Sequence, residues 1–204
     1  MPEIADAWHR ITDWLQHRAP DSYAGLRTGA GPAAIATVEG ALGLRILVEL
    51  HVLWLMTAGD DGADGWGCLP GSEALMPLET VADTNQRKMR FQAEQVLRNA
   101  DLPEEERIHT WKPSWIPLVG LGPDDRTSGR YLDTQTGYPG RWSRYNEPSG
   151  EELDTPITYL EAAADMLESP ALATRDRPGL LGGTPVWWSS IDLVREDRWR
   201  PVTE

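Results

Sequence analysis

Hydrophobic residues recur at helical spacing along much of the chain. Near the N-terminus, a spacing of four, three and four positions predicts one face of a helix over residues 3–18, formed by Ile4, Trp8, Ile11 and Leu15. Ala19-Pro20-Asp21 is expected to end this helix, because the residue before a proline is displaced from helical geometry. A glycine-rich loop is predicted next, over residues 25–31.

Two more helices are predicted in the first half of the chain. Pro32 suits the first turn of the earlier one. Its apolar side consists of Ile35, Val38 and Leu42. Gly43 is expected to break it, and the later helix then runs to about residue 58, with Gly59 as its predicted C-terminal cap. The apolar side of that helix consists of Leu47, Leu50 and Trp54.

The remaining helices differ in how strongly they are signalled. Residues 79–99 form a highly charged helical segment with one thin apolar stripe, which we expect to be partly buried. This stripe consists of Val81, Met89, Ala93 and Val96. Thr155-Pro156 is a helix start, with a capping residue before a proline, and Pro170 is expected to stop that helix. Its apolar face consists of Ile157, Leu160, Ala164 and Leu167.

Between these helical segments lies a stretch with the pattern of a small sheet, residues 111–142. Short apolar runs bounded by Gly, Pro and Asp predict strands at residues 115–119, 129–134 and 141–145. Two shorter strands are expected at residues 66–70 and 74–78. Residues 146–154 are expected to form an acidic loop, and the segment around residues 175–183 is predicted to be a loop. The fold class predicted is α+β, with a small, mostly antiparallel sheet flanked by helices.

Composition and charge narrow the classes of function. The formal net charge is −13, which opposes binding to nucleic acid and favours a basic protein partner, although an acidic surface also serves solubility alone. The most apolar run, residues 46–56, is shorter than the about 20 residues of a membrane span. The N-terminus lacks the pattern of a secretory signal, and Cys68 is the one cysteine. We therefore expect a cytoplasmic protein that does not interact with membranes.

Few residues are candidates for catalysis or metal binding. No nucleophile elbow, zinc-binding histidine pair or dinucleotide-binding glycine motif is present in the sequence. Asp60, Asp61 and Asp64 could suit calcium, but they lack the spacing of a calcium loop and a solvated turn is the better prediction. Asp125 and Asp133 could act as a hydrolytic carboxylate pair if a hairpin brought them together. We predict no enzyme, no cofactor and no metal.

The order of several short motifs resembles the SUKH superfamily, which contains a yeast cell-wall assembly regulator and many bacterial immunity proteins. The motifs lie in and before the predicted sheet: Trp115-Ile116-Pro117, residues 122–125, Tyr131-Leu132-Asp133, Gly137, Ile35, Glu39, Leu42-Gly43, residues 59–62 and Leu69-Pro70-Gly71. The resemblance covers about residues 30–168. It implies a SUKH-like domain (31–168), preceded by an N-terminal helix and loop (1–30). The extension beyond it (169–204) is too apolar for a free tail, so we expect its tryptophans to dock on that domain.

The resemblance also implies a function, namely binding and neutralising a toxin protein, such as a nuclease, without catalysis. A regulatory or scaffolding role, and a sugar-binding or hydrolytic role based on the ten tryptophans, are the alternatives. The family gives no fixed set of binding residues, so the predicted partner surface comes from side-chain chemistry alone. It consists of Asp124, Asp125, Tyr131, Asp133, Tyr138 and Trp142. The acidic turn within it could equally be a simple solvated turn.

Overall fold

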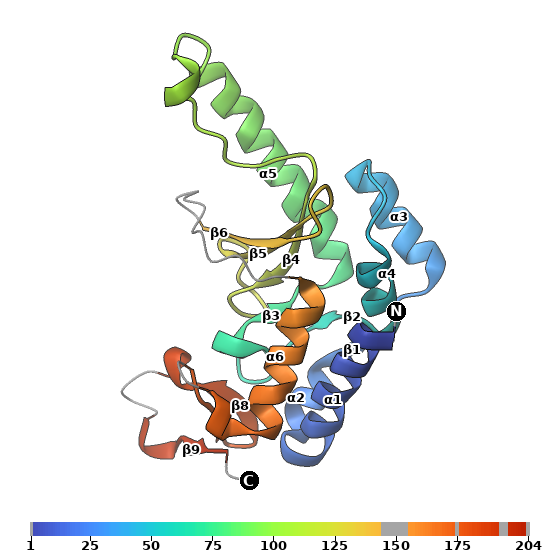
Figure 1. Cartoon of the computed structure of the whole chain (residues 1–204), viewed down its shortest axis with the longest axis vertical. Coiled ribbons are helices and arrows are strands. Elements are labelled where there is room, and N and C mark those ends of the chain that lie inside the picture. The colour runs from blue at the N-terminus through green and yellow to red at the C-terminus, as the bar shows by residue number, and fades with distance from the viewer. Residues whose placement is uncertain (1, 144–154, 174–175, 192–195, 203–204) are drawn as a thin grey trace.

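The computed structural model describes residues 2–143, 155–173, 176–191 and 196–202, and these form an α+β fold (Figure 1). The helices are α1 (Pro2–Arg18), α2 (Pro20–Gly25), α3 (Pro32–Leu42), α4 (Val48–Met56), α5 (Leu78–Arg98) and α6 (Pro156–Glu168). The strands are β1 (Leu26–Thr28), β2 (Thr57–Asp60), β3 (Ala74–Leu75), β4 (Trp115–Gly120), β5 (Gly129–Asp133), β6 (Pro139–Trp142), β7 (Pro178–Leu181), β8 (Thr184–Trp187) and β9 (Arg200–Pro201). The predicted loop of residues 146–154 lies outside the described residues.

The predicted meander is confirmed as the centre of the largest sheet, whose strands are antiparallel and follow the order β3-β4-β5-β6. All six residues of β4 are buried, as expected of a central strand covered on both faces. The third strand begins two residues earlier than predicted, because Gly137 adopts a positive φ and Pro139 already pairs with Leu132. In Figure 1 the sheet lies between α5 above and α6 below.

One hydrophobic core connects the three parts into which the sequence was divided. It takes Ile11 and Leu15 from α1, Ile116 from the central sheet, Leu160 from α6 and Trp187 from the C-terminal strands. α1 packs against α6, and Arg10 donates hydrogen bonds to Asp165 and Glu168 at the edge of that contact. Thr155 caps α6 as predicted, accepting a hydrogen bond from the Thr158 amide.

Several local predictions are wrong. Gly59 does not cap a helix: α4 ends at Met56, and Gly59 lies in β2, where an added Cβ would meet Pro77 Cα at 2.6 Å. The predicted loop of residues 25–31 contains β1, which pairs with β2. Residues 66–70 make only isolated bridges, and the next strand is confined to Ala74–Leu75. The predicted loop around residues 175–183 contains β7, because Gly179 gives room for the Trp199 ring.

The C-terminal half of α5 leaves the body of the molecule (Figure 1). The chain turns at residues 99–106, where a short 3-10 helix (Glu104–Glu106) lies, and then returns toward β4. We call residues 90–109 the arm. The expectation of a partly buried apolar stripe holds for Val81, which is buried, but not for Ala93 and Val96, which are exposed on the arm.

Across the described ranges, none of the helices combines the length and the apolar character that crossing a bilayer requires.

Candidate functional site

Two acidic segments that are 60 residues apart in the sequence meet at one edge of the molecule. Residues 61–65 form the first and the β4–β5 turn, residues 121–128, forms the second. They are so close that a Cβ on Gly62 would lie 2.3 Å from Pro123 Cγ. Asp61, Asp64 and Asp124 are exposed and Asp125 is half-buried. We call these four residues the acidic edge.

A buried carboxylate shapes the first acidic segment. Asp60 is fully buried, unlike the solvated residue that the sequence predicted, and its oxygens accept hydrogen bonds from the amides of Gly62 (2.7 Å) and Cys68 (3.0 Å). Burial raises the pKa of Asp60, although these two amide donors act in the opposite direction. Asp60 thereby folds the chain back on itself and directs the next residue, Asp61, outward.

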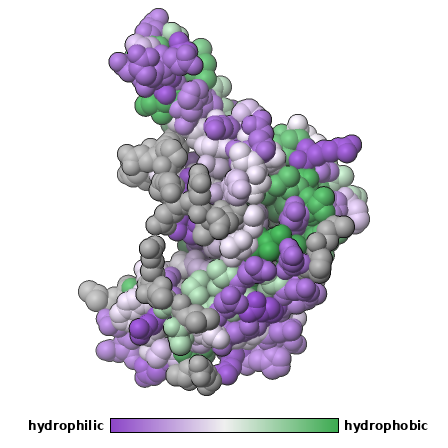
Figure 2. Space-filling view, viewed as in Figure 1, coloured by the Kyte–Doolittle hydropathy of each residue, from purple (hydrophilic) through white to green (hydrophobic). Residues whose placement is uncertain are grey.

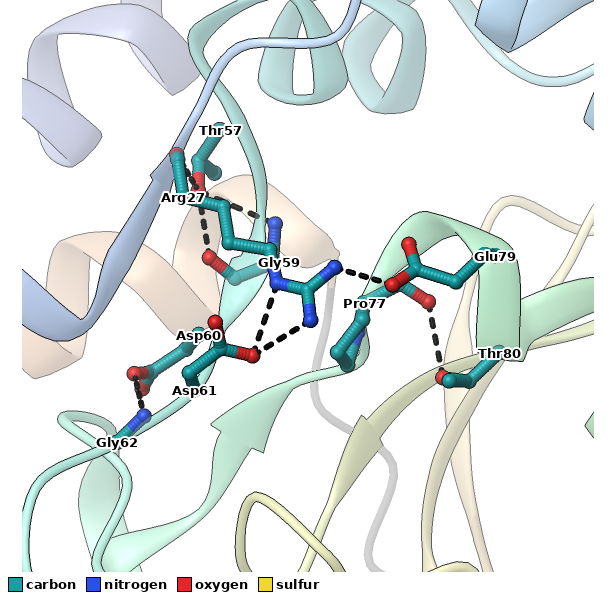
Figure 3. A network of polar contacts seen from close by, with 9 residues as sticks. All are labelled: Arg27, Thr57, Gly59, Asp60, Asp61, Gly62, Pro77, Glu79 and Thr80. Carbon is teal, nitrogen blue, oxygen red and sulfur yellow. Dashed lines mark hydrogen bonds and ion pairs between the residues drawn. The ribbon is translucent and has the colours of Figure 1, made fainter.

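Arg27 fixes one member of the acidic edge (Figure 3). Its Nε lies 2.8 Å from Asp61 Oδ1, and another guanidinium nitrogen contacts the carboxylate of Glu79. The Arg27 backbone is itself held, because its carbonyl accepts a hydrogen bond from Thr57 Oγ1 (3.1 Å). Partial burial of Glu79 opposes its ionisation, but hydrogen bonds from its own amide and from Arg27 outweigh this, and the pKa of Glu79 is lowered. Asp61 is therefore oriented and partly neutralised.

The second acidic segment presents a hydrophobic side chain among its carboxylates. Asp125 Oδ1 accepts hydrogen bonds from the amide (2.6 Å) and the hydroxyl (2.7 Å) of Thr127, which closes the turn. Leu121 is 51% exposed, and Asp124 is exposed beside it in the sequence. An exposed leucine on a turn with two carboxylates and one exposed cation, Arg126, suits contact with a protein surface that carries basic residues.

The other four residues of the predicted partner surface do not join the acidic edge. Asp133 pairs with Trp115 at one end of the β4–β5 hairpin, and the acidic turn lies at the other end. Asp133 is buried and accepts hydrogen bonds from Trp115 Nε1 and the Gln135 amide. Its separation from the acidic turn also contradicts the idea that Asp125 and Asp133 form a hydrolytic pair.

The aromatic residues predicted for partner binding mostly contact other parts of the same chain. The ring of Tyr131 stacks on Trp115, with centroids 3.8 Å apart. Trp142 is 4% exposed and lies edge-on to Trp111. Tyr138 alone projects, at 51% exposure, beside a hollow of about 370 Å³ between the β5–β6 turn and the start of α6. Residue type alone could not distinguish the buried ring of Trp142 from the exposed ring of Tyr138.

Core packing explains most of the tryptophans placed by the structure. Trp8 and Trp54 are buried, as expected from their places on apolar helix faces, and Trp115 and Trp187 are buried as well. Trp188 is 45% exposed and lies edge-on to Trp199. Among the residues that can be placed, no three His, Cys, Asp or Glu side chains are grouped closely enough to hold a metal ion.

The local sequence pattern does not indicate that residues 61–65 border the β4–β5 turn. The available signal was Gly62 and Gly122, where an added Cβ would lie 2.3 Å from Pro123 Cγ and 3.5 Å from the Gly65 carbonyl oxygen. The local pattern also does not indicate a buried group formed by Glu73, Arg130 and Tyr159, since nothing in it marks those positions as polar and internal.

Comparison with known proteins adds no relative: no protein-family model matches the chain, and no curated protein matches it at a significant level.

Proposed function

We propose that this chain is a non-enzymatic, SUKH-like immunity protein of the cytoplasm that binds and neutralises a basic toxin protein through the acidic edge. The observation that carries the proposal is the meeting of two acidic segments, of which the second also exposes Leu121. The order of sequence motifs supports the family assignment, and the α+β fold with its antiparallel meander is compatible with it.

Charge would act at two ranges. The net charge of −13 produces a long-range field that attracts a cationic protein and accelerates its approach. At short range, Asp64, Asp124 and Asp125 would face basic side chains of the partner, while the exposed Leu121 would supply apolar contact. Asp61 is already oriented by Arg27, so little conformational freedom would be lost there on binding.

The proposed mechanism is stoichiometric occlusion. A partner seated on the acidic edge would have its basic surface covered, and a toxin that acts on nucleic acid needs such a surface to contact phosphates. This mechanism needs no reacting group on the present chain. It is consistent with the positions of Asp125 and Asp133, which lie at opposite ends of their hairpin.

Co-expression tests the proposed function. The chain is produced together with the toxin-like domain encoded beside its gene, and growth and co-purification are measured. We expect restored growth and a complex that contains one toxin domain for each copy of this chain. A toxin that still kills and does not co-purify would contradict the proposal.

A further inference from the structure

The arm carries a hydrophobic helix face whose outer residues, Val96 and Leu97, are exposed. Met89, Ala93, Val96 and Leu97 follow the spacing of one apolar stripe along α5. Met89 packs partly against the core, whereas Val96 is 53% and Leu97 77% exposed. Figure 2 shows hydrophobic atoms along the arm directly beside its hydrophilic tip.

Polar side chains, not the stripe, fasten the arm. Gln92 is buried, and its Oε1 accepts hydrogen bonds from the Thr110 amide (2.6 Å), the Thr110 hydroxyl (2.8 Å) and the Trp111 amide (3.1 Å). Asn99, also buried, donates to the Ile108 carbonyl (2.8 Å). The returning segment is therefore bonded to the flank of α5 next to Val96, and Val96 and Leu97 still remain exposed.

The charges along the arm are separated by sign. Arg87 and Arg90 are exposed where the arm leaves the body, and the tip carries exposed Asp101, Glu104, Glu105 and Glu106. Two other basic residues have partners within the arm: Arg98 lies 3.9 Å from Glu94, and Arg107 donates to the Leu102 carbonyl. The arm is thus basic where it leaves the body and acidic at its tip. Arg90 and Asp101 are about 16 Å apart along the arm at the rise of an α-helix.

We propose that a second copy of this chain covers the stripe, with the two arms packed antiparallel about a two-fold axis near residues 95–96. In that arrangement Ala93 of each copy faces the region of Leu97 in the other, so that apolar surface meets apolar surface. The tip of each arm lies beside the base of the other, and Asp101 approaches the partner's Arg90. A parallel arrangement would place the acidic tips together and is disfavoured by charge.

The same surface supplies both halves of this contact, which is the requirement for a two-fold symmetric interface. It also resolves an electrostatic conflict, because two chains of net charge −13 repel one another unless the facing surfaces are complementary. The contact is short, about three helical turns, so we expect a weak dimer that forms with increasing concentration. This inference does not depend on the proposed function.

Sedimentation velocity of the purified chain alone tests the dimer. We expect dimer to form with increasing concentration at low salt and less dimer at high salt. Leu97→Glu should weaken dimerisation at least about tenfold, because a carboxylate would be buried between the arms. Val48→Glu is the matched control: Val48 is 55% exposed on α4, away from the arm, and this variant should dimerise like the unmodified chain.

Charge reversal tests the antiparallel arrangement. Arg90→Glu alone should weaken the dimer, and Arg90→Glu combined with Asp101→Arg in the same chain should restore it, because both symmetric pairs are then inverted. All four altered residues are exposed, so far-ultraviolet circular dichroism should show unchanged folding. A chain that remains monomeric at every concentration, a Leu97→Glu variant that dimerises normally, or a double reversal that fails to restore dimerisation would overturn the inference.

Discussion

At the scale of single residues, the group formed by Glu73, Arg130 and Tyr159 is the most demanding feature of the interior. Arg130 Nε lies 2.5 Å from Glu73 Oε2, and Tyr159 donates a hydrogen bond to the same oxygen at 2.7 Å. The Arg130 guanidinium also lies over the Tyr159 ring, 4.9 Å from its centroid. All three side chains are buried, so each charge or donor depends on the other two for its partner. The group ties β5 and α6 to the segment before β3.

Removing the carboxylate should destabilise the protein strongly. Glu73→Gln leaves the buried Arg130 cation without a counter-charge, and we expect the free energy of unfolding in urea to fall by about 3–5 kcal/mol. Glu79→Gln is the matched control, because Glu79 also contacts an arginine but is exposed, and it should cost at most about 1 kcal/mol. Equal losses in the two variants would show that burial is not what makes the contact of Glu73 important.

Lys88 offers a test by pH. Burial, together with the charge of Arg87, lowers the pKa of Lys88 to about 8 from the ordinary 10.5. Between these two values the unfolded chain binds more protons than the folded one, so this lysine makes the free energy of unfolding rise with pH. Lys88→Met should lose that rise when both proteins are unfolded in urea across the same pH range, and the exposed Lys112→Met should keep it.

The absence of this rise with pH would have a specific cause, the contact of Lys88 with an aromatic ring. Its Nζ lies 4.2 Å from the centroid of the Trp142 ring, a contact that favours the charged form. If the contact with the ring outweighed burial, the free energy of unfolding of the unmodified chain would show no greater rise with pH than that of Lys88→Met.

At the scale of elements, the sequence predicted the segments that have a regular spacing of apolar residues or a capping residue. α1 was expected from four regularly spaced apolar residues, α6 from Thr155-Pro156, and the meander from its alternation of apolar runs and turns. β7 was missed because its glycines and proline indicate a loop, and the packing of Trp199 against Gly179 is invisible to local pattern. The projection of the arm was missed because periodicity predicts a helix but not whether another element covers it.

Gln92 gives a prediction about the arm as an element. Gln92→Leu would leave three donor groups of Thr110 and Trp111 without their acceptor. We expect a loss of about 1–3 kcal/mol in the free energy of unfolding and faster hydrogen exchange at the Thr110 and Trp111 amides. The neighbouring exposed Glu94→Ala should change neither by a comparable amount. Unchanged exchange at those two amides in Gln92→Leu would contradict the assigned role of this side chain.

At the scale of the whole molecule, two surface regions differ in their chemistry. The acidic edge joins segments that the sequence showed separately, and its composition suits a basic partner. The arm lies apart from it and suits a second copy of the chain. Asp124 and Asp125 were predicted from residue type alone and lie on the acidic edge, whereas Asp133 and Trp142, predicted by the same reasoning, are buried. A side chain's type indicates what it can bind, and the tertiary fold decides whether it is accessible.

The central claim is that the acidic edge binds a basic partner, and association kinetics test it most directly. Stopped-flow fluorescence at low and high salt would follow the chain and its Asp124→Lys/Asp125→Lys variant binding the toxin-like domain encoded beside the gene. The matched control, Asp6→Lys/Asp13→Lys, changes the net charge equally through two exposed residues of α1. We predict that the edge variant associates about tenfold more slowly at low salt and with a weaker salt dependence, well beyond the effect in the control. Equal rates for the edge variant and the control, or no binding by the unmodified chain, would contradict the account.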